Sequence, residues 1–270
     1  MLHISLRNGG NILNGLKELY DYREMIISLV KKDLRGRYKG SVLGFLWTFI
    51  NPLLQLAIYT VVFSTIMRAG IEEYYIFLFV ALIPWIFFST SISGGASCIL
   101  NQKDMVKKIY FPREVLPIAH VTSCFVNMLF CFSIIFGVVF ISGIGVNINA
   151  ILYLPIIFII EYILALGVAM FSSAITVYFR DFEHILGILT MAWMYLTPIM
   201  YSIDMIPEEY KNLFLLNPMT SIIVAYRDIL YYKSIPQMTH LLNAIILGIM
   251  ILIIGIIVFS KLKKNFVEEL

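Results

Sequence analysis

The sequence NQKDMVKKIYFPREVLP, residues 101–117, is a basic island between two apolar stretches that are each long enough to cross a lipid bilayer. Read as a helix, its first half divides into two faces. The charged face carries Lys103, Asp104, Lys107 and Lys108, and the apolar face carries Met105, Val106, Ile109 and Tyr110. Pro112 disfavours helical backbone at the residue before it, and Pro117 can open the next helix. The stretch predicts a short amphipathic helix in a loop outside the membrane.

The composition places the rest of the chain within a membrane. Of its 270 residues 60% are hydrophobic and 14% are charged, with a mean hydropathy of +0.87, whereas soluble domains carry about 25% charged residues. We therefore predict an all-α membrane protein with one domain over residues 1–270. The basic residues flank apolar runs instead of forming a solvated stripe, so nucleic acid is not expected as a partner.

Hydropathy predicts six transmembrane helices, because six apolar runs come near the ~20 residues that a bilayer requires. They cover residues 42–66, 75–97, 118–141, 151–177, 185–200 and 241–260. Residues 15–38 combine an apolar stripe with many charges, which predicts an interface helix lying on membrane lipid. Residues 201–240 form the longest predicted external segment, in which Pro207 and Asn217-Pro218 begin two short re-entrant helices.

The distribution of basic residues predicts the orientation. Of the 20 Lys and Arg residues, 16 lie in the segments on the side of the two chain ends. The other four, on the opposite side, are Arg68, Lys211, Arg227 and Lys233. Basic residues gather on the cytoplasmic side of membrane proteins, so both termini and residues 101–117 are predicted to be cytoplasmic.

Catalytic motifs are missing from the sequence. It contains no HExxH, GxSxG or phosphate-binding GxxxxGK[ST] pattern, and its three cysteines and four histidines are scattered, so we expect no metal site. Energy for transport must then come from an ion gradient or from a partner. Glu161 is the one charge well inside a predicted span, and it is either a proton site or a carboxylate that packs helices together.

A partner ATPase would need a cytoplasmic docking surface, and two loops offer one. The first is residues 101–117, including Arg113. The second is YFRDFEH, residues 178–184, in which Arg180 and Asp181 either contact the partner or pair with each other. A movement pressing on these loops would tilt the helices that they join.

The predicted first and fifth spans hold the candidate pathway residues. Pro52 removes a backbone hydrogen bond from the first span, and Asn51 and Gln55 place two amides on one of its faces, toward a pathway or a neighbouring helix. Aromatic rings there offer platforms for sugars or belong to ordinary interfacial belts. These rings are Trp47, Tyr59, Trp193 and Tyr195.

Four stretches of the sequence resemble one protein family. They are RYKGSVLGFLWTFINPLLQLAIYTVVF (37–63), LIPWIFFSTSI (82–92), YFRDFEHIL (178–186) and TPIMYSIDMIPEEYKNLFLLNPM (197–219). Together they look like the permease subunit of type-2 ABC exporters for cell-surface polysaccharides such as O-antigen, teichoic acid and capsule. The resemblance implies a multi-pass protein of the bacterial cytoplasmic membrane.

The resemblance also implies partners. Two copies of the permease would assemble with two copies of a separate ATP-binding subunit, and residues 101–117 would be its coupling loop. ATP and magnesium would bind to that subunit, and this chain would hold no cofactor. The cargo would be a polysaccharide on an undecaprenyl-type lipid. The alternatives are a type-2 ABC permease for a small lipid or drug, and a gradient-driven carrier.

Overall fold

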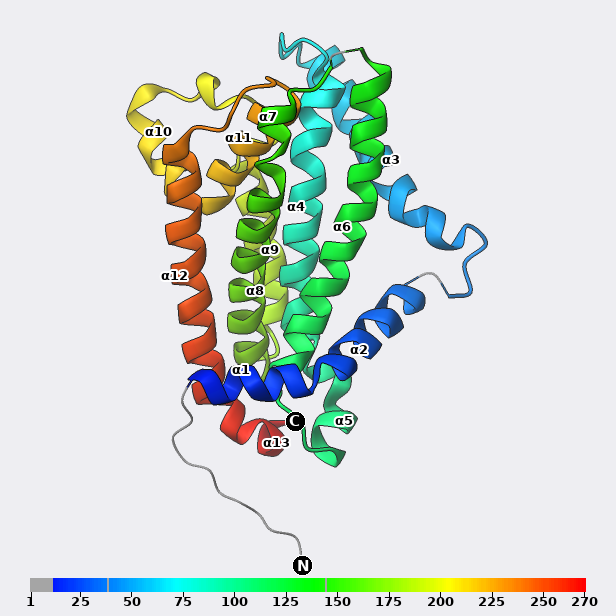
Figure 1. The fold of residues 1–270 in the computed structure, drawn as a ribbon, viewed down its shortest axis with the longest axis vertical. Helices are drawn as coiled ribbons and strands as arrows, with labels where there is room; N and C mark the ends of the chain where they lie inside the picture. Colours follow the sequence, from blue (N-terminus) through cyan, green and yellow to red (C-terminus); the bar gives the residue numbers. More distant parts are fainter. Residues whose placement is uncertain (1–11, 38, 144) are drawn as a thin grey trace, which may run out of the picture.

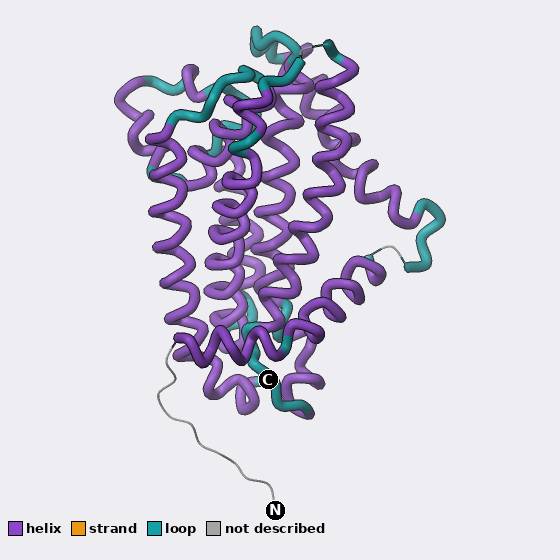
Figure 2. The backbone as a smooth tube through the Cα atoms, viewed as in Figure 1, coloured by secondary structure: helices purple, strands orange, loops and turns teal. Residues whose placement is uncertain are grey.

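A computed structural model describes residues 12–37, 39–143 and 145–270. The described residues form helices and connecting loops, with no strand among them (Figure 2). The α-helices are α1 Ile12–Asp21, α2 Arg23–Gly36, α3 Trp47–Thr60, α4 Tyr74–Ser97, α5 Lys103–Lys108, α6 Val115–Ile141, α7 Ile148–Ile151, α8 Leu154–Tyr178, α9 Phe182–Tyr195, α10 Glu208–Leu215, α11 Pro218–Leu230, α12 Met238–Leu262 and α13 Phe266–Glu269. The prediction of an all-α chain is confirmed.

The long helices run side by side, and the short ones lie at the two ends of the bundle (Figure 1). In the described part of the chain, five segments are long and apolar enough to cross a membrane. They are Gly44–Ile66, Tyr74–Ser97, Val115–Ile141, Ile148–Tyr178 and Met238–Glu269. A sixth is counted only if α10 and α11, which meet at a bend of 102°, are taken as one broken span.

The predicted span over residues 185–200 is wrong as a continuous helix. Helix α9 ends at Tyr195 after 14 residues, and residues 196–202 continue without helix before a single 3-10 turn, Ile203–Met205, leads toward α10. Pro198 is the physical reason, because proline disfavours helical backbone at the residue before it. Since α8 and α12 both run toward the end that carries α5 and α13, the chain still crosses the bundle between them, partly as α9 and partly as this link (Figure 1).

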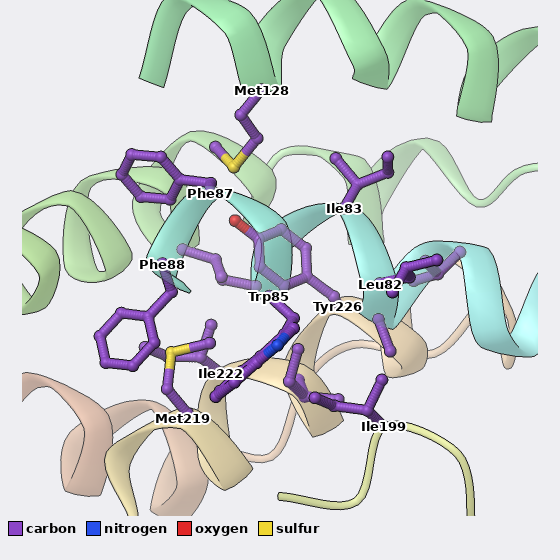
Figure 3. Close-up of a cluster of buried hydrophobic side chains, with 14 of the residues drawn as sticks. Leu82, Ile83, Trp85, Phe87, Phe88, Met128, Ile199, Met219, Ile222 and Tyr226 are labelled. Carbon is purple, nitrogen blue, oxygen red and sulfur yellow. The ribbon is translucent and has the colours of Figure 1, made fainter. Parts of the chain in front are cut away.

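Helix α4 is the centre of the bundle and is buried over most of its length. Figure 3 shows Ile83 and Phe87 of α4 pointing toward Met128 of α6, while Trp85 and Phe88 point toward Ile222 and Met219 of α11. One apolar core therefore joins α4 and α6 to α11, which lies at the end of the bundle opposite α5.

Helices α8 and α12 form the most extensively packed pair, and glycine makes their approach possible. A Cβ atom on Gly255 would lie 2.3 Å from the carbonyl oxygen of Gly167. A Cβ atom on Gly167 would lie 2.7 Å from the backbone of Leu252. Neither contact can be relieved by turning a side chain, because the obstructing atoms belong to the backbone.

The link that follows α9 (the α9–α10 link, residues 196–202) is held by side-chain donors. Arg227 of α11, 3% exposed, donates from Nη1 to the carbonyl oxygens of Pro198 and Tyr201 and from Nη2 to that of Ile199. Tyr74 donates its hydroxyl to the carbonyl of Met200 at 2.8 Å. A backbone without helical hydrogen bonds is thereby satisfied inside the protein, as an apolar surrounding requires.

Replacing Gly255 by alanine should destabilise the bundle by about 1–3 kcal/mol, because the two backbones must separate to admit one methyl group. Thermal unfolding of the purified protein in detergent would measure this. Gly137→Ala in α6 is the matched control, since its Cβ would meet nothing within 4 Å. Equal melting temperatures for the two variants would contradict the packing role of Gly255.

Arg227→Met should lower stability more strongly than Gly255→Ala, because it strands several buried carbonyls at about 1–3 kcal/mol each. Arg227→Lys should rescue little, since one ammonium cannot reach the same spread of acceptors. Lys233→Met removes an exposed cation near the same end of the bundle and should change little. Folded yield and melting temperature are the measurements, and a stable Arg227→Met variant would refute the role assigned to the guanidinium.

Candidate functional site

The basic loop, residues 101–117, lies at the end of the bundle that also carries α1, α2 and α13 (Figure 1). Its helix α5 ends at Lys108, and Ile109 is already extended. The predicted apolar face therefore divides in two. Val106 is buried and Met105 half-buried, but Ile109 is 56% and Tyr110 81% exposed. The expectation that all four side chains share one helical face is wrong, because the helix ends one residue before Ile109.

The charged face of α5 is exposed to solvent. Lys103, Asp104, Lys107 and Lys108 are all exposed. Within the described residues none of the four takes part in an ion pair. Next to them stand the exposed side chains of Ile109 and Tyr110, so this face combines positive charge with apolar surface.

Arg113 fastens the loop to itself. Its guanidinium donates to the carbonyl oxygens of Val106 at 2.8 Å, Ile109 at 3.0 Å and Phe111 at 3.2 Å, and it lies over the Phe111 ring. Burial lowers the pKa of Arg113, while Tyr110 and Glu114 act in the opposite direction. Arg113, predicted to contact a partner, has its donors occupied by the end of α5 and so sets the shape of the loop.

A second, smaller apolar core supports the loop from beneath. We call it the end core: Cys98, Ile99, Val106, Phe111, Val115, Leu116, Met170, Ala174, Val177, Phe259 and Phe266. Its members come from the loop, from the ends of α4, α8 and α12, and from α13. Residues of α2 such as Ile26 and Leu29 pack against it. The loop is thus seated on several helices at once.

The second predicted docking loop is also exposed. Arg180 and Asp181 lie in the turn between α8 and α9, with Phe179 47% exposed beside them. Among the described residues neither charged side chain forms an ion pair, so the local Arg180–Asp181 pair left open by the sequence does not form. Both loops therefore present unpaired charges and exposed apolar side chains at the same end of the bundle.

The predicted interface helix, residues 15–38, is divided at Tyr22 into α1 and α2. A polar cluster that the sequence does not predict fixes α2 to α6. Arg37 donates to Asp33 at 2.9 Å and to Sγ of Cys124 at 3.1 Å, and Ser123 donates to the same Asp33 carboxylate. The one available signal was the i, i+4 spacing of Asp33 and Arg37.

The electrostatics of this cluster stabilise the charged form of Asp33. Burial alone raises the pKa of its carboxyl, but the hydrogen bond from Ser123 and the charge of Arg37 outweigh burial and lower the pKa below 3.8. A cavity of about 350 Å³ opens beside it, with Lys32, Gln102 and His120 in its wall. The cavity separates part of α2 from the ends of α4 and α6.

The predicted pathway residues of α3 lie on the least covered helix of the bundle. Asn51 and Gln55 are exposed, so their amides face away from the rest of this chain. Trp47 is half-buried and donates its indole N–H to Ser41 at 2.9 Å. An amide that faces lipid without a hydrogen-bond partner raises the free energy of a spanning helix. We therefore expect this face of α3 to contact a polar surface.

The three remaining aromatic candidates do not act alike. Tyr59 of α3 and Tyr195 of α9 lie within electrostatic range of each other, and Tyr195 is 62% exposed. Trp193 instead donates its indole N–H to Asn217 at 2.8 Å and packs edge-on against Phe88. Trp193 therefore helps to hold the start of α11, whereas Tyr195 is accessible and Tyr59 is partly buried against the apolar core.

Glu161 of α8 is fully buried and joins two helices. It accepts a hydrogen bond of 2.7 Å from the hydroxyl of Tyr226 in α11, and its Oε1 has no hydrogen-bond partner within the described residues. The rings of Phe132 and Phe158 pack against Tyr226. Of the two interpretations of Glu161, this geometry favours the carboxylate that packs helices together.

Asp33→Asn should loosen α2 from α6. The pKa of Asp33 is lower in the folded protein than in the unfolded chain, so the ionised carboxylate stabilises the attachment of α2 to α6. This stabilisation is fully present above the ordinary aspartate pKa and is lost as the pH falls through the lowered pKa. At neutral pH we expect trypsin to cleave the variant after Lys32 or Arg35 several-fold faster than the wild type, since local opening governs cleavage. Asp21→Asn, at an exposed position of α1, is the control. Equal cleavage rates in the two variants would rule out the attachment.

Comparison with known proteins places these features among transport proteins. Residues 24–231 match the family model of the ABC-2 type transporters. The chain is 35% identical over 257 residues to an O-antigen export system permease protein, RfbA, of Myxococcus xanthus, covering 94% of this chain and 98% of that one. An RfbA protein of Klebsiella pneumoniae is 32% identical, covering 92% and 95%. The capsule polysaccharide export inner-membrane protein CtrC of Neisseria meningitidis is 21% identical, covering 93% and 95%.

Proposed function

The chain belongs to the ABC-2 type transporter family, and from this we propose that it is the permease subunit of an ATP-driven exporter of a lipid-linked cell-surface polysaccharide. The observation that carries the proposal is the identity of 32–35% with O-antigen export permeases over more than nine-tenths of both chains. The names of these and of the capsule relatives favour O-antigen or capsule over teichoic acid as the cargo.

In this function the loop 101–117 is the coupling loop, and a separate ATP-binding subunit is its partner. The exposed lysines of α5 beside Ile109 and Tyr110, and the unpaired Arg180 and Asp181, support docking at this end. ATP and magnesium belong to the partner subunit. Because most basic residues lie on this side, we assign it to the cytoplasm, together with both termini.

A second copy of the chain completes the passage in this proposal. Asn51 and Gln55 on the uncovered face of α3, together with Tyr195, offer polar and aromatic side chains that one copy does not enclose, and the partly buried Tyr59 lies on the same helix α3. Facing a second copy across a channel, they would meet the sugar units, while the undecaprenyl-type chain would remain in lipid. The bacterial cytoplasmic membrane is the corresponding location.

Two alternatives make different predictions. A permease for a small lipid or drug shares the fold, but the named relatives export polysaccharides. The hypothesis of a gradient-driven carrier rests on Glu161 alone. The carboxylate of Glu161 is fully buried and accepts a hydrogen bond from Tyr226. The polysaccharide exporter is therefore the function that the observations support best.

The test combines a deletion with a charge reversal. Cells lacking the chain should accumulate lipid-linked glycan on the cytoplasmic side, and the tagged wild-type chain should restore export and copurify with an ATP-binding subunit. Lys107→Glu/Lys108→Glu should weaken that association at least about tenfold, because the reversed charges oppose a surface complementary to lysine. Lys233→Glu, an exposed substitution in the connection between α11 and α12, is the control.

The outcomes separate the alternatives. Drug sensitivity with normal surface glycan in the deletion strain would favour the small-molecule permease. Transport by the reconstituted chain without any ATPase, lost in Glu161→Gln, would establish the gradient-driven carrier. Unchanged association and export in the lysine variant would show that α5 is not the docking element.

A further inference from the structure

Residues 263–270 follow the end of α12 at Leu262. A turn of 3-10 helix, Lys263–Asn265, leads into α13, which lies across the same end of the bundle as α5 (Figure 1). Lys263 and Lys264 in residues 263–270 contribute to the positive charge of this end, and the segment also makes specific contacts. We call it the brace.

On one side the brace is fixed to the ends of α8 and α12. Phe266 is fully buried, with its ring edge-on to Phe259 of α12 at 5.5 Å and tilted against Tyr178 of α8 at 6.3 Å. The hydroxyl of Tyr178 donates to the carbonyl oxygen of Leu262 at 2.8 Å. Apolar packing of Phe266 thus joins the brace to α8 and α12, and the Tyr178–Leu262 hydrogen bond joins those two helices to each other just before the brace begins. The same two helices also pack closely at Gly167 and Gly255.

On the other side the brace holds the coupling loop. Lys263 forms an ion pair with Glu114, whose side chain is 15% exposed. The other carboxylate oxygen of Glu114 is buried and has no hydrogen-bond partner among the described residues. Phe266 shares the end core with Val106 and Phe111 of the loop. Removing Lys263 would leave the partly buried carboxylate of Glu114 without its ion-pair partner, which would destabilise the folded loop.

We infer that the brace is a positioning element that ties the coupling loop to α8 and α12, so that a push on α5 reaches helices the loop does not join covalently. The inference rests on the proposed function. Residues 101–117 connect only α4 to α6 along the chain. The same loop also contacts the α8–α12 pair through the Lys263–Glu114 ion pair and through Phe266. Helix α12 packs in turn against α11, at the end of the bundle opposite α5.

A charge swap tests the ion pair as the connection. Glu114→Lys and Lys263→Glu, made singly, should still copurify with the ATP-binding subunit but export about tenfold less glycan per ATP hydrolysed. The double variant Glu114→Lys/Lys263→Glu should recover most of the loss, which a merely structural disturbance would not do. Lys264→Glu, at the exposed neighbouring position, should behave as wild type.

The native thiol of Cys98 gives a second measurement that needs no ATPase. Cys98 belongs to the end core and is 8% exposed, so in the purified chain with Cys124→Ser and Cys131→Ser it should react slowly with a maleimide. Phe266→Ala and Lys263→Glu should accelerate this labelling about tenfold if the brace closes the end core.

Normal export in both single charge variants, or a double variant as poor as the singles, would overturn the inference. Unchanged Cys98 labelling in Phe266→Ala would do the same. If no ATP-binding subunit copurifies even with the wild type, the proposed function fails instead. Faster labelling would then still show that the brace closes the end core.

Discussion

A polypeptide that crosses an apolar medium has to satisfy its own backbone polar groups, and the α9–α10 link is where this chain meets that demand without a helix. Arg227 and Tyr74 supply donors to four successive carbonyl oxygens, from Pro198 to Tyr201. The guanidinium also lies over the ring of Phe77, 3.5 Å from its centroid, which compensates part of its lost hydration. The position of α11, and with it the far end of the bundle, depends on this group.

The same constraint divides the molecule into a rigid part and an uncovered part. Glycine contacts hold α8 against α12, and the Tyr226–Glu161 hydrogen bond holds α11 against α8. Helix α3 belongs to the least buried of the five candidate spans and keeps Asn51 and Gln55 outward. In the proposed exporter, the rigid part would carry force and the uncovered part would face the second copy and the cargo.

The sequence was sufficient where a property repeats along the chain, and insufficient where distant residues meet. Long apolar runs predicted six spanning helices, and five of them are present as long apolar helices in the described part of the chain. Averaging over the sixth run concealed the effect of Pro198 on α9. Arg227 was counted as one more external cation, because nothing near it in the sequence shows that its acceptors lie 26 to 29 residues away. Likewise, Glu161 is joined to Tyr226 across 65 residues, and Ser123 to Asp33 across 90.

In the basic loop, residues 101–117, the sequence pattern predicts the amphipathic character correctly but not which apolar side chains are buried. Its apolar side chains do form an amphipathic element, but they serve two purposes: Val106 and Phe111 anchor the loop in the end core, and Ile109 and Tyr110 remain exposed. A loop anchored in this way can present its exposed side chains without first ordering them, which reduces the entropic cost of binding a partner. Arg113, by closing the end of α5, and the brace, by closing the core beneath, both contribute to that pre-organisation. Docking strength and force transmission would then depend on different residues of one loop, and for that reason the two can be separated by substitution.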